Sequence, residues 1–247
     1  MDAHDAVAWP TIEPTAAWGL DLETSDRGSA LLTGGCAVYA PLHYEPKYRY
    51  PLVVWLHGSG GSEAQLRRIM PFVSLRNYVA VAPRGVEPVG FGEDGSRFGY
   101  SWNDACDAFS LAGERVFEAI DHARERFQVN PNRIFLAGYE SGGTTALRLA
   151  LTHPESFAGV LSLEGPLPRT GRIFSSLKAV KKLPIFLAHS RRSRSYPADW
   201  VSDDLKALNS AGMHATLREY PGAQELSTQM LSDVDRWIMN IVASPSR

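Results

Sequence analysis

The sequence predicts an α/β protein built on a mostly parallel, twisted sheet with helices on both faces. Short runs of consecutive apolar residues, such as 52–56 and 134–138, are typical of strands buried on both faces. They alternate with segments of helical periodicity, such as 108–127, at a spacing that indicates parallel strands joined by crossover helices. The chain has 247 residues, 44% hydrophobic and 21% charged, which suffices for one sizeable core.

The first elements follow from glycine placement and apolar runs. Residues 30–40 have the pattern of a strand pair bent at Gly34-Gly35. Continuous apolar runs at 52–56 and 78–82 predict two buried strands, and the helical period of residues 63–75 predicts a helix between them. The sheet is therefore expected to begin with a strand–helix–strand unit.

The middle of the chain is predicted from composition and from a proline break. Residues 85–104 are rich in glycine and aromatic residues, which favours a loop. Residues 108–127 place apolar side chains on or near one stripe of a helix, and Asn130-Pro131-Asn132 ends that helix. A buried strand at 134–138 then leads almost directly into a helix at 142–152.

The last third continues the alternation. Its predicted elements are strands at 158–163, 184–188 and 213–220 and helices near 198–210 and at 225–242. Because every predicted helix lies between two strands or after the last one, both faces of the sheet are expected to be covered.

The chain is divided into an acidic arm and one domain. Residues 1–26 carry six acidic side chains before the first basic one, Arg27, and Trp9 and Trp18 indicate that part of this arm packs down. Residues 27–247 show no internal repeat and no shift in composition that would mark a linker. They are expected to form a single domain.

Composition excludes several functional classes. The formal net charge is −2, so no overall field attracts nucleic acid, and none is expected as a partner. The two cysteines, Cys36 and Cys106, form no metal-binding pattern, and neither a metal nor a cofactor is expected. The acidic start MDAHDAVAWP does not have the pattern of a signal peptide, and no stretch approaches 18 apolar residues. A cytoplasmic protein without a membrane span is expected.

The segment 133–165 contains the most informative motif. A buried strand runs into a glycine-flanked turn and then a helix, which is the context of the nucleophile elbow G-x-Nuc-x-G, with Gly138 and Gly142 as the glycines. Here the chain resembles the α/β-hydrolase superfamily, and within it the phospholipase/carboxylesterase and polyhydroxybutyrate-depolymerase-like esterases. The resemblance implies an α/β-hydrolase fold without a large cap.

Two further segments carry this resemblance, which extends over most of residues 30–242. Residues 39–63 resemble the third strand and the oxyanion loop H-G-x-G-G of these esterases, and 210–238 resemble their last strand, catalytic-histidine loop and last helix. By this resemblance, backbone donors of an oxyanion hole are expected at Ser59 and Ser141.

The chain departs from the family pattern at all three catalytic positions. Glu140 occupies the position of the nucleophilic serine in the elbow. Ser193 occupies the position of the acid in the pattern H-G-x-x-D, and Gln224 that of the histidine in Y-P-G-G-H-E. The motifs around these positions are kept, so the three side chains are expected to converge at the C-terminal edge of the sheet.

These substitutions argue against ordinary Ser-His-Asp hydrolysis. In a serine protease, loss of the serine or the histidine alone lowers turnover about 10⁶-fold. An amide such as that of Gln224 does not take up a proton near neutral pH. The leading hypothesis is therefore a degenerate, catalytically inactive hydrolase that serves as a binding, scaffold or assembly protein.

Two enzymatic alternatives remain open. Glu140 could act as a nucleophile or base, because carboxylate nucleophiles are chemically sound. Such chemistry still needs a histidine to activate water, and the candidates are poorly placed for that role: His57, His153, His189 and His214. The second alternative is a weak carboxylic-ester hydrolase in which the neighbouring Ser141 is a displaced nucleophile.

The elbow also predicts the surroundings of Glu140. Its side chain is expected at the N-terminus of the following helix, where the helix dipole favours a negative charge. Backbone N–H groups near Ser59 and Ser141 are expected to hold the ionised carboxylate. A permanent anion would then occupy the place of a transient oxyanion.

A basic segment adjoins the predicted site. Residues 165–198 contain no acidic residue and eight basic ones, and Arg191, Arg192 and Arg194 flank the position of the missing acid. An anionic ligand or an acidic protein is a candidate partner for the 169–194 part, and the acidic arm could associate with it within one chain or between copies. The candidate pocket-lining aromatic residues are Phe98, Tyr100 and Trp102.

Overall fold

The computed structural model describes residues 35–91, 97–103, 106–169 and 177–244. The acidic arm predicted for residues 1–26 lies outside these ranges. So do residues 30–34 of the first predicted strand pair, Arg172 of the basic segment and the side chain of Phe98.

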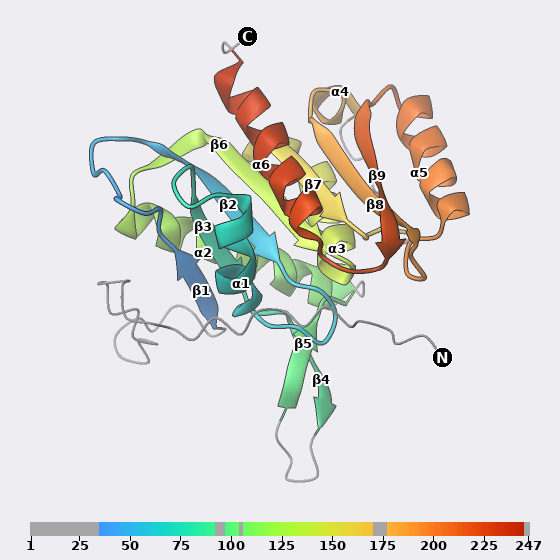
Figure 1. The fold of residues 1–247 in the computed structure, drawn as a ribbon, viewed down its shortest axis with the longest axis horizontal. Helices are drawn as coiled ribbons and strands as arrows, with labels where there is room; N and C mark the ends of the chain where they lie inside the picture. The colour runs from blue at the N-terminus through green and yellow to red at the C-terminus, as the bar shows by residue number, and fades with distance from the viewer. Residues whose placement is uncertain (1–34, 92–96, 104–105, 170–176, 245–247) are drawn as a thin grey trace, which may run out of the picture. The chain divides into compact units, whose positions relative to one another are not determined.

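A seven-stranded sheet in the order β1-β3-β2-β6-β7-β8-β9 forms the centre of the described domain (Figure 1). β1 is antiparallel to β3, and every other neighbouring pair is parallel. The predicted mostly parallel sheet is confirmed. Its strands are β1 (Cys36–Tyr39), β2 (Tyr50–Leu56), β3 (Val79–Pro83), β6 (Val129–Tyr139), β7 (Gly159–Leu163), β8 (Ile185–Arg192) and β9 (Ala215–Ala223).

Helices pack on both faces of this sheet, as the strand–helix alternation predicts. The described helices are α1 (Gln65–Val73), α2 (Cys106–Arg126), α3 (Ser141–Thr152), α4 (Leu177–Val180), α5 (Ala198–Ser210) and α6 (Thr228–Ala243), with a 3-10 turn at Pro154–Ser156. None of the helices in the described ranges has the length and apolar character that crossing a bilayer requires.

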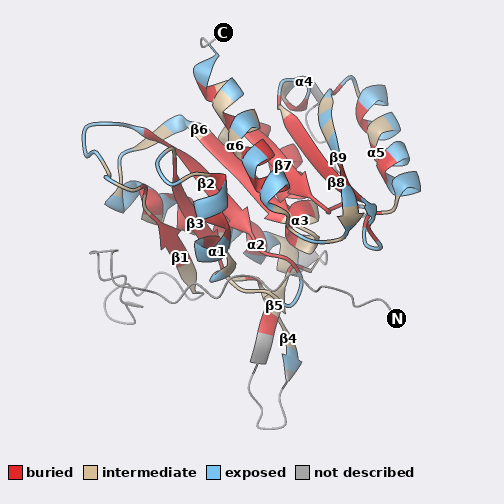
Figure 2. Ribbon diagram, viewed as in Figure 1, coloured by how far each residue is buried: buried red, intermediate tan, exposed pale blue. Residues whose placement is uncertain are grey.

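The core consists of two apolar clusters on opposite faces of the sheet, because side chains alternate along each strand. Along β2, Val54 belongs to the cluster that contains side chains of α2 and α3, and Trp55 belongs to the cluster that contains side chains of α1 and α6. Figure 2 shows the buried strands in red between helices that expose their outer sides. This double cover explains why β2, β3 and β7 are buried throughout and mainly apolar.

The loop predicted for residues 85–104 contains a hairpin, so that prediction is wrong in part. β4 (Glu87–Phe91) and β5 (Arg97–Ser101) form a two-stranded antiparallel sheet, which projects from the main sheet in Figure 1. Hydrogen bonds between the backbones of Gly60, Gly61 and Tyr100 attach its base to the loop after β2. The hairpin escapes detection because it does not belong to the core and lacks strand-like alternation.

The break predicted at Asn130-Pro131-Asn132 lies inside β6 rather than between elements. β6 begins at Val129, which pairs with Tyr50, and its register against β2 shifts before Leu52 pairs with Ile134. Pro131 and Asn132 are exposed in this irregular stretch, where a missing N–H group costs little. Helix α2 already ends at Arg126, and the proline inside β6 does not prevent strand pairing.

Candidate functional site

A strained turn joins β6 to α3 at the C-terminal edge of the sheet. Glu140 lies between the two elements with φ 50° and ψ −120°, a conformation that a non-glycine residue adopts at a cost of about 1–3 kcal/mol. Its backbone N–H donates to the Leu163 carbonyl at 2.8 Å, and its carbonyl accepts from Thr144 N–H at 3.0 Å. The Glu140 backbone is thus held from both sides, and its side chain leaves the turn at the N-terminus of α3.

Two glycines make this turn sterically possible. A Cβ atom added to Gly138 would lie 2.3 Å from the carbonyl oxygen of Gly142. A Cβ atom added to Gly142 would lie 2.3 Å from the carbonyl oxygen of Leu56, at the end of β2. Helix α3 therefore approaches the backbone of β2 more closely than any side chain would permit. The predicted strand–turn–helix elbow is present.

The Glu140 carboxylate lies against the loop that follows β2. A Cβ atom added to Gly58 would lie 2.9 Å from Oε2 of Glu140. Ser59 is exposed in this loop, and its Oγ accepts a hydrogen bond from Ser101 Oγ at 3.3 Å. The Oγ of Ser141 is buried and has no hydrogen-bond partner within the described residues. The carboxylate thus lies beside the predicted oxyanion loop.

Gln224 is the side chain that binds Glu140. It follows β9, and its Nε2 donates a short hydrogen bond to Oε1 of Glu140. Its Oε1 accepts from the backbone N–H of Ser195 at 3.1 Å, in the loop after β8. These two bonds fix the orientation of the amide, so its N–H faces an acceptor on Glu140. The structure therefore brings Glu140 and Gln224 together, 84 residues apart in the chain.

The donor to Glu140 differs from the one the sequence predicts. We expected backbone N–H groups near Ser59 and Ser141, whereas the donors to the carboxylate are two side chains: the Gln224 amide and the Tyr139 hydroxyl. Gln224 reaches Glu140 because it directly follows β9, whose last residue pairs with the last residue of β8. An amide donor places no positive charge beside the carboxylate.

Tyr139 precedes Glu140 and remains a neutral phenol. Burial raises its pKa well above the ordinary value of 10, and the carboxylates of Glu140 and Glu164 raise it further. The hydroxyl group is therefore a proton donor rather than a phenolate at any physiological pH. The sequence analysis did not single out Tyr139 as a site residue.

Ser193 lies in the loop after β8 but its side chain has a local role. The residue is buried, and its Oγ accepts a hydrogen bond from the Tyr196 N–H at 3.1 Å. Its own N–H donates to the Ser190 carbonyl at 2.9 Å. Ser193 thus stabilises the turn that contains Ser195. The hydrogen bond to Gln224 comes from the backbone N–H of Ser195 and not from the Ser193 side chain.

The elbow, the glycine loop and the last-strand loop form one constellation at the sheet edge. The family model described as phospholipase/carboxylesterase matches residues 45–242. The chain belongs to the phospholipase/carboxylesterase family.

Curated relatives of this family member include esterases and a thioesterase. It is 33% identical over 118 residues to the putative esterase NocK of Nocardia uniformis subsp. tsuyamanensis, covering 48% of this chain and 33% of that one. It is 27% identical over 134 residues to acyl-protein thioesterase 1 of Schizosaccharomyces pombe, covering 53% of this chain and 59% of that one. The chain thus spans less than two thirds of the length of these relatives.

A solved structure confirms the α/β-hydrolase fold of this family member. The crystal structure of Arabidopsis thaliana SOBER1 is 23% identical, with a TM-score of 0.64 over 78% of this chain and 99% of that one. The crystal structure of the Bacillus cereus carboxylesterase is 17% identical, with a TM-score of 0.64 over 85% of this chain and 95% of that one. The resemblance inferred from the elbow and the H-G-x-G-G loop is correct at the level of family and fold.

The four histidines considered as bases lie away from the Glu140–Gln224 pair in this phospholipase/carboxylesterase-family protein, or contact other groups. His57 is buried, its Nδ1 bonds the Gly58 carbonyl at 2.8 Å, and its Nε2 accepts from Gly85 N–H at 2.9 Å. His153 follows the far end of α3 and contacts the Phe117 ring. His189 is buried in β8 against the Tyr196 ring, and His214 precedes β9. None of these imidazoles is hydrogen-bonded to Glu140 or Gln224 within the described residues.

Lowering the pH is expected to destabilise the protein through His57. Burial lowers the pKa of His57 below its ordinary value of 6.5, at which it titrates in the unfolded chain. Below that pH the unfolded state binds a proton that the folded state excludes, so the free energy of unfolding falls as pH falls towards the folded pKa, by about 1.4 kcal/mol per unit of pKa difference. Urea unfolding at pH 7.5 and 5.5 should show a smaller decline in His57→Gln than in the wild type.

The matched control is His43→Gln, at an exposed histidine outside this site. It should decline with pH like the wild type. Equal declines in the wild type and in His57→Gln would contradict the assignment to His57.

Glu164 is a site residue that the sequence analysis missed. It follows β7, has φ 59°, and is fully buried. Neither carboxylate oxygen has a hydrogen-bond partner among the described residues, although the carboxylate lies near enough to Tyr139 and Tyr196 to raise the pKa of both phenols. An acidic residue directly after a buried strand, at the edge where α/β proteins bind ligands, was the signal available.

An open pocket of about 480 Å³ lies beside Gln224. Its lining residues are Arg192, Arg194, Ala223 and Gln224. Arg191, the third arginine of the predicted cluster, forms an ion pair with Glu219 instead, at 2.5 Å. Of these three arginines, Arg191 is therefore paired with an acidic residue, and Arg192 and Arg194 line the pocket.

Two of the aromatic residues predicted to line a pocket, Tyr100 and Trp102, contact the glycine loop. Trp102 is buried, and its Nε1 donates to the His57 carbonyl at 2.9 Å. The Tyr100 backbone pairs with Gly60 and Gly61, and its ring faces the Arg84 guanidinium at 4.9 Å. Neither contributes to the pocket beside Gln224.

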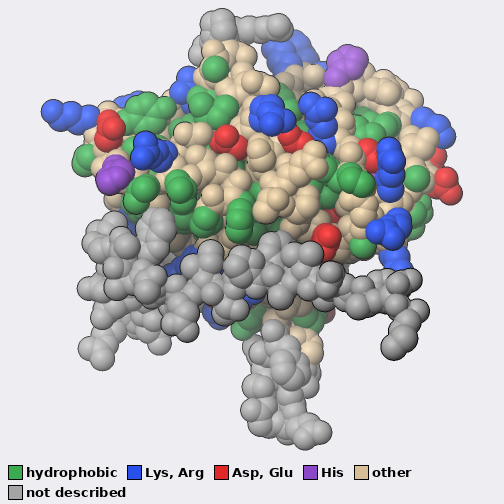
Figure 3. All heavy atoms as spheres, in the orientation of Figure 1, with side chains coloured by type: hydrophobic (Ala, Val, Ile, Leu, Met, Phe, Trp, Pro, Cys, Tyr) green, Lys and Arg blue, Asp and Glu red, His purple; other side chains and the backbone are tan. Residues whose placement is uncertain are grey.

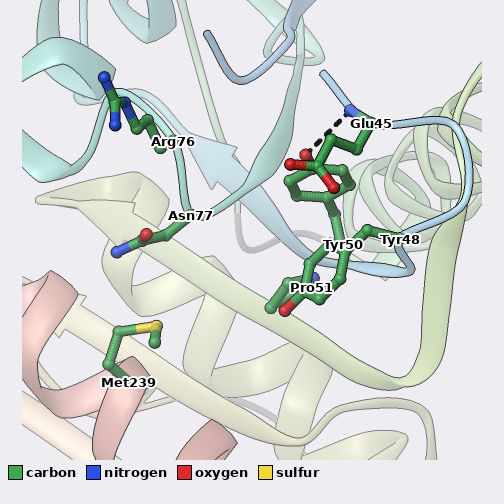
Figure 4. A pocket seen from close by; sticks show the side chains of 7 residues that line it. All are labelled: Glu45, Tyr48, Tyr50, Pro51, Arg76, Asn77 and Met239. Carbon is green, nitrogen blue, oxygen red and sulfur yellow. Dashed lines mark hydrogen bonds between the residues drawn. The ribbon is translucent and has the colours of Figure 1, made fainter. Parts of the chain in front are cut away.

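A second pocket, of about 220 Å³, lies at the opposite edge of the sheet. Figure 4 shows Tyr50 and Pro51, at the start of β2, with Glu45, Tyr48, Arg76, Asn77 and Met239. Because β2 ends at Leu56 beside the elbow, this pocket is one strand length away from Glu140. It is unconnected with the family's catalytic positions.

No group of three or more His, Cys, Asp or Glu side chains within the described ranges is arranged to hold a metal ion. What this site offers chemically is a half-buried carboxylate, a neutral phenol and a fixed amide. The carboxylate could act as a nucleophile or a base, but the amide beside it cannot accept its proton.

Proposed function

We propose that this chain is a non-hydrolytic member of the phospholipase/carboxylesterase family, which uses the altered site for binding. The hydrogen bond from Gln224 to Glu140 carries the proposal. It joins the two positions that correspond, by the family motifs, to the catalytic histidine and serine. A carboxylate accepting from an amide has neither the hydroxyl nucleophile nor the base that acyl transfer in this family implies.

The position of the carboxylate adds a second obstacle to hydrolysis. Glu140 lies against Gly58 in the glycine loop, where a substrate carbonyl oxygen would need to bind. A substrate would have to displace an anion that a hydrogen bond from Gln224 holds in place. The site therefore favours binding over turnover, for electrostatic as well as chemical reasons.

Ester hydrolysis by the purified protein is expected to equal that of a Glu140→Ala variant. Neither protein has a serine–histidine pair, so p-nitrophenyl acetate and butyrate should be hydrolysed at the same low rate by both. A fluorophosphonate probe, which reacts with activated serines, should label neither. Comparison of rates and labelling on one preparation of each protein tests the proposal.

A second candidate function is hydrolysis with Glu140 as nucleophile or base. The neutral phenol of Tyr139 favours it, because a proton donor then lies next to the carboxylate. Saturable ester hydrolysis that disappears in Glu140→Ala would establish this function and overturn the first. Fluorophosphonate labelling that disappears in Ser141→Ala would instead identify a weak conventional esterase.

A further inference from the structure

The pocket beside Gln224 is formed by the ends of two neighbouring strands. Arg192 is the last residue of β8 and pairs in register with Ala223, the last residue of β9. Gln224 follows β9, and Arg194 lies two residues beyond β8. A volume of about 480 Å³ is within the range of small-molecule sites. The walls therefore come from the sheet edge itself, where α/β proteins bind ligands.

The two arginines of this pocket are available to a ligand. Arg192 and Arg194 are both exposed, and within the described ranges neither forms an ion pair. Other described arginines of the basic segment are neutralised: Arg191 pairs with Glu219, and Arg169 pairs with Asp204 at 2.9 Å. Two guanidinium groups in one pocket offer paired N–H donors to an anion that carries about two charges.

The surroundings favour a small soluble anion over other occupants. Ala223 is the one apolar residue among the four described residues that line the pocket, so this lining offers little apolar surface to an acyl chain. On the face shown in Figure 3, Lys and Arg side chains are interspersed with acidic and hydrophobic ones rather than gathered into one basic surface. Arg192 and Arg194, neither of which forms an ion pair in the described ranges, lie in one pocket, and they match a compact anion better than an extended acidic surface.

We propose that this pocket binds a small soluble molecule that carries a phosphate monoester group, through Arg192 and Arg194. A tetrahedral phosphate has about two negative charges near neutral pH and accepts bidentate hydrogen bonds from each guanidinium. The amide of Gln224 separates the phosphate from the Glu140 carboxylate, with which a second anion would otherwise clash. The proposal rests on the proposed binding role of the altered site and specifies its ligand.

Calorimetric titration with inorganic phosphate at low ionic strength tests this proposal. The test variant is Arg192→Ala/Arg194→Ala. The control is Lys181→Ala/Lys182→Ala, which removes two exposed positive charges just before β8, at the other end of that strand. Eight residues of β8 separate the two pairs by about 25 Å. Phosphate affinity should fall at least tenfold in the test variant and less than twofold in the control.

Three results would overturn the proposal. The first is that the wild type does not bind phosphate at about 10 mM. The second is that Arg192→Ala/Arg194→Ala binds phosphate with unchanged affinity. The third is that both double variants lose the same affinity, which would indicate attraction by the overall positive charge and not by this pocket. A polyglutamate peptide that binds more tightly than phosphate and weakens equally in both variants would also overturn it, in favour of an acidic protein partner. Thermal unfolding of each variant checks that the exposed substitutions leave the fold intact.

Ester hydrolysis measured on the same samples separates this proposal from the proposed function. If the wild type hydrolyses esters and also binds phosphate through Arg192 and Arg194 as expected, only the non-hydrolytic role is overturned. Absence of both turnover and phosphate binding would overturn the ligand assignment alone. The two proposals therefore fail in different assays.

Discussion

Combined substitution of Glu140→Ser, Gln224→His and Ser193→Asp is expected to convert this protein into an ester hydrolase. The strained backbone at Glu140, the glycine loop beside it and the contact between positions 140 and 224 are already in place. A serine–histidine–aspartate set adds the missing nucleophile and base to this framework. We expect kcat/KM for p-nitrophenyl butyrate to rise at least about 10³-fold over the wild type.

The aspartate has a specific task in this design. Ser193 now accepts a hydrogen bond from Tyr196 N–H, and one oxygen of an aspartate can keep that bond while the other faces the new histidine. The control carries Glu140→Ala with the other two substitutions, so it lacks only the nucleophile. It should show no gain and no fluorophosphonate labelling. A triple variant that folds, yet hydrolyses no faster than this control, would refute the assignment of the three positions.

Gly142→Ala is expected to destabilise the fold by about 3 kcal/mol or more, since overpacking against rigid backbone cannot be relieved by rotating a side chain. The added Cβ would lie 2.3 Å from the Leu56 carbonyl oxygen and 2.5 Å from that of His57. The backbone at the end of β2 would have to move away from α3. Urea unfolding measures the change in free energy.

Gly113→Ala is the matched control, because it makes the same chemical change inside α2. Its Cβ would meet Cδ2 of Leu149 at 3.3 Å, the end of a flexible side chain. Alanine in a helix interior is favoured over glycine by about 1 kcal/mol, so this variant should be as stable as the wild type or slightly more so. Similar free energies of unfolding for the two variants would contradict the steric account of the elbow.

Most of the fold could be predicted because the sheet is covered on both faces. Strands such as β2 and β7 are buried throughout, and the resulting apolar runs are visible in the sequence. The hairpin β4–β5 could not be found in this way, since it pairs outside the core. The irregular start of β6 could not be predicted for a related reason. Pro131 indicates an interruption of regular secondary structure, but the sequence does not show that Val129, before it, already pairs with β2.

The site was predictable as far as local motifs extend. The flanking residues located Glu140 and Gln224, and their hydrogen bond agrees with that alignment. The identity of the donor depends on how far Gln224 reaches beyond β9, which no local pattern specifies. The surroundings of the buried Glu164 also depend on the fold, because Tyr139 and Tyr196 near its carboxylate come from distant parts of the chain.

The bonds on either side of Gln224 also determine how protons behave at this site. A histidine in that place could relay protons, because imidazole receives a proton on one nitrogen and releases one from the other. The amide of Gln224 cannot relay protons. It accepts a hydrogen bond from the Ser195 N–H and donates one to Glu140, and it keeps the same hydrogens near neutral pH. The chain of donors runs in one fixed direction and ends at the carboxylate. Near neutral pH this link therefore has a single arrangement, whereas an imidazole would alternate between two.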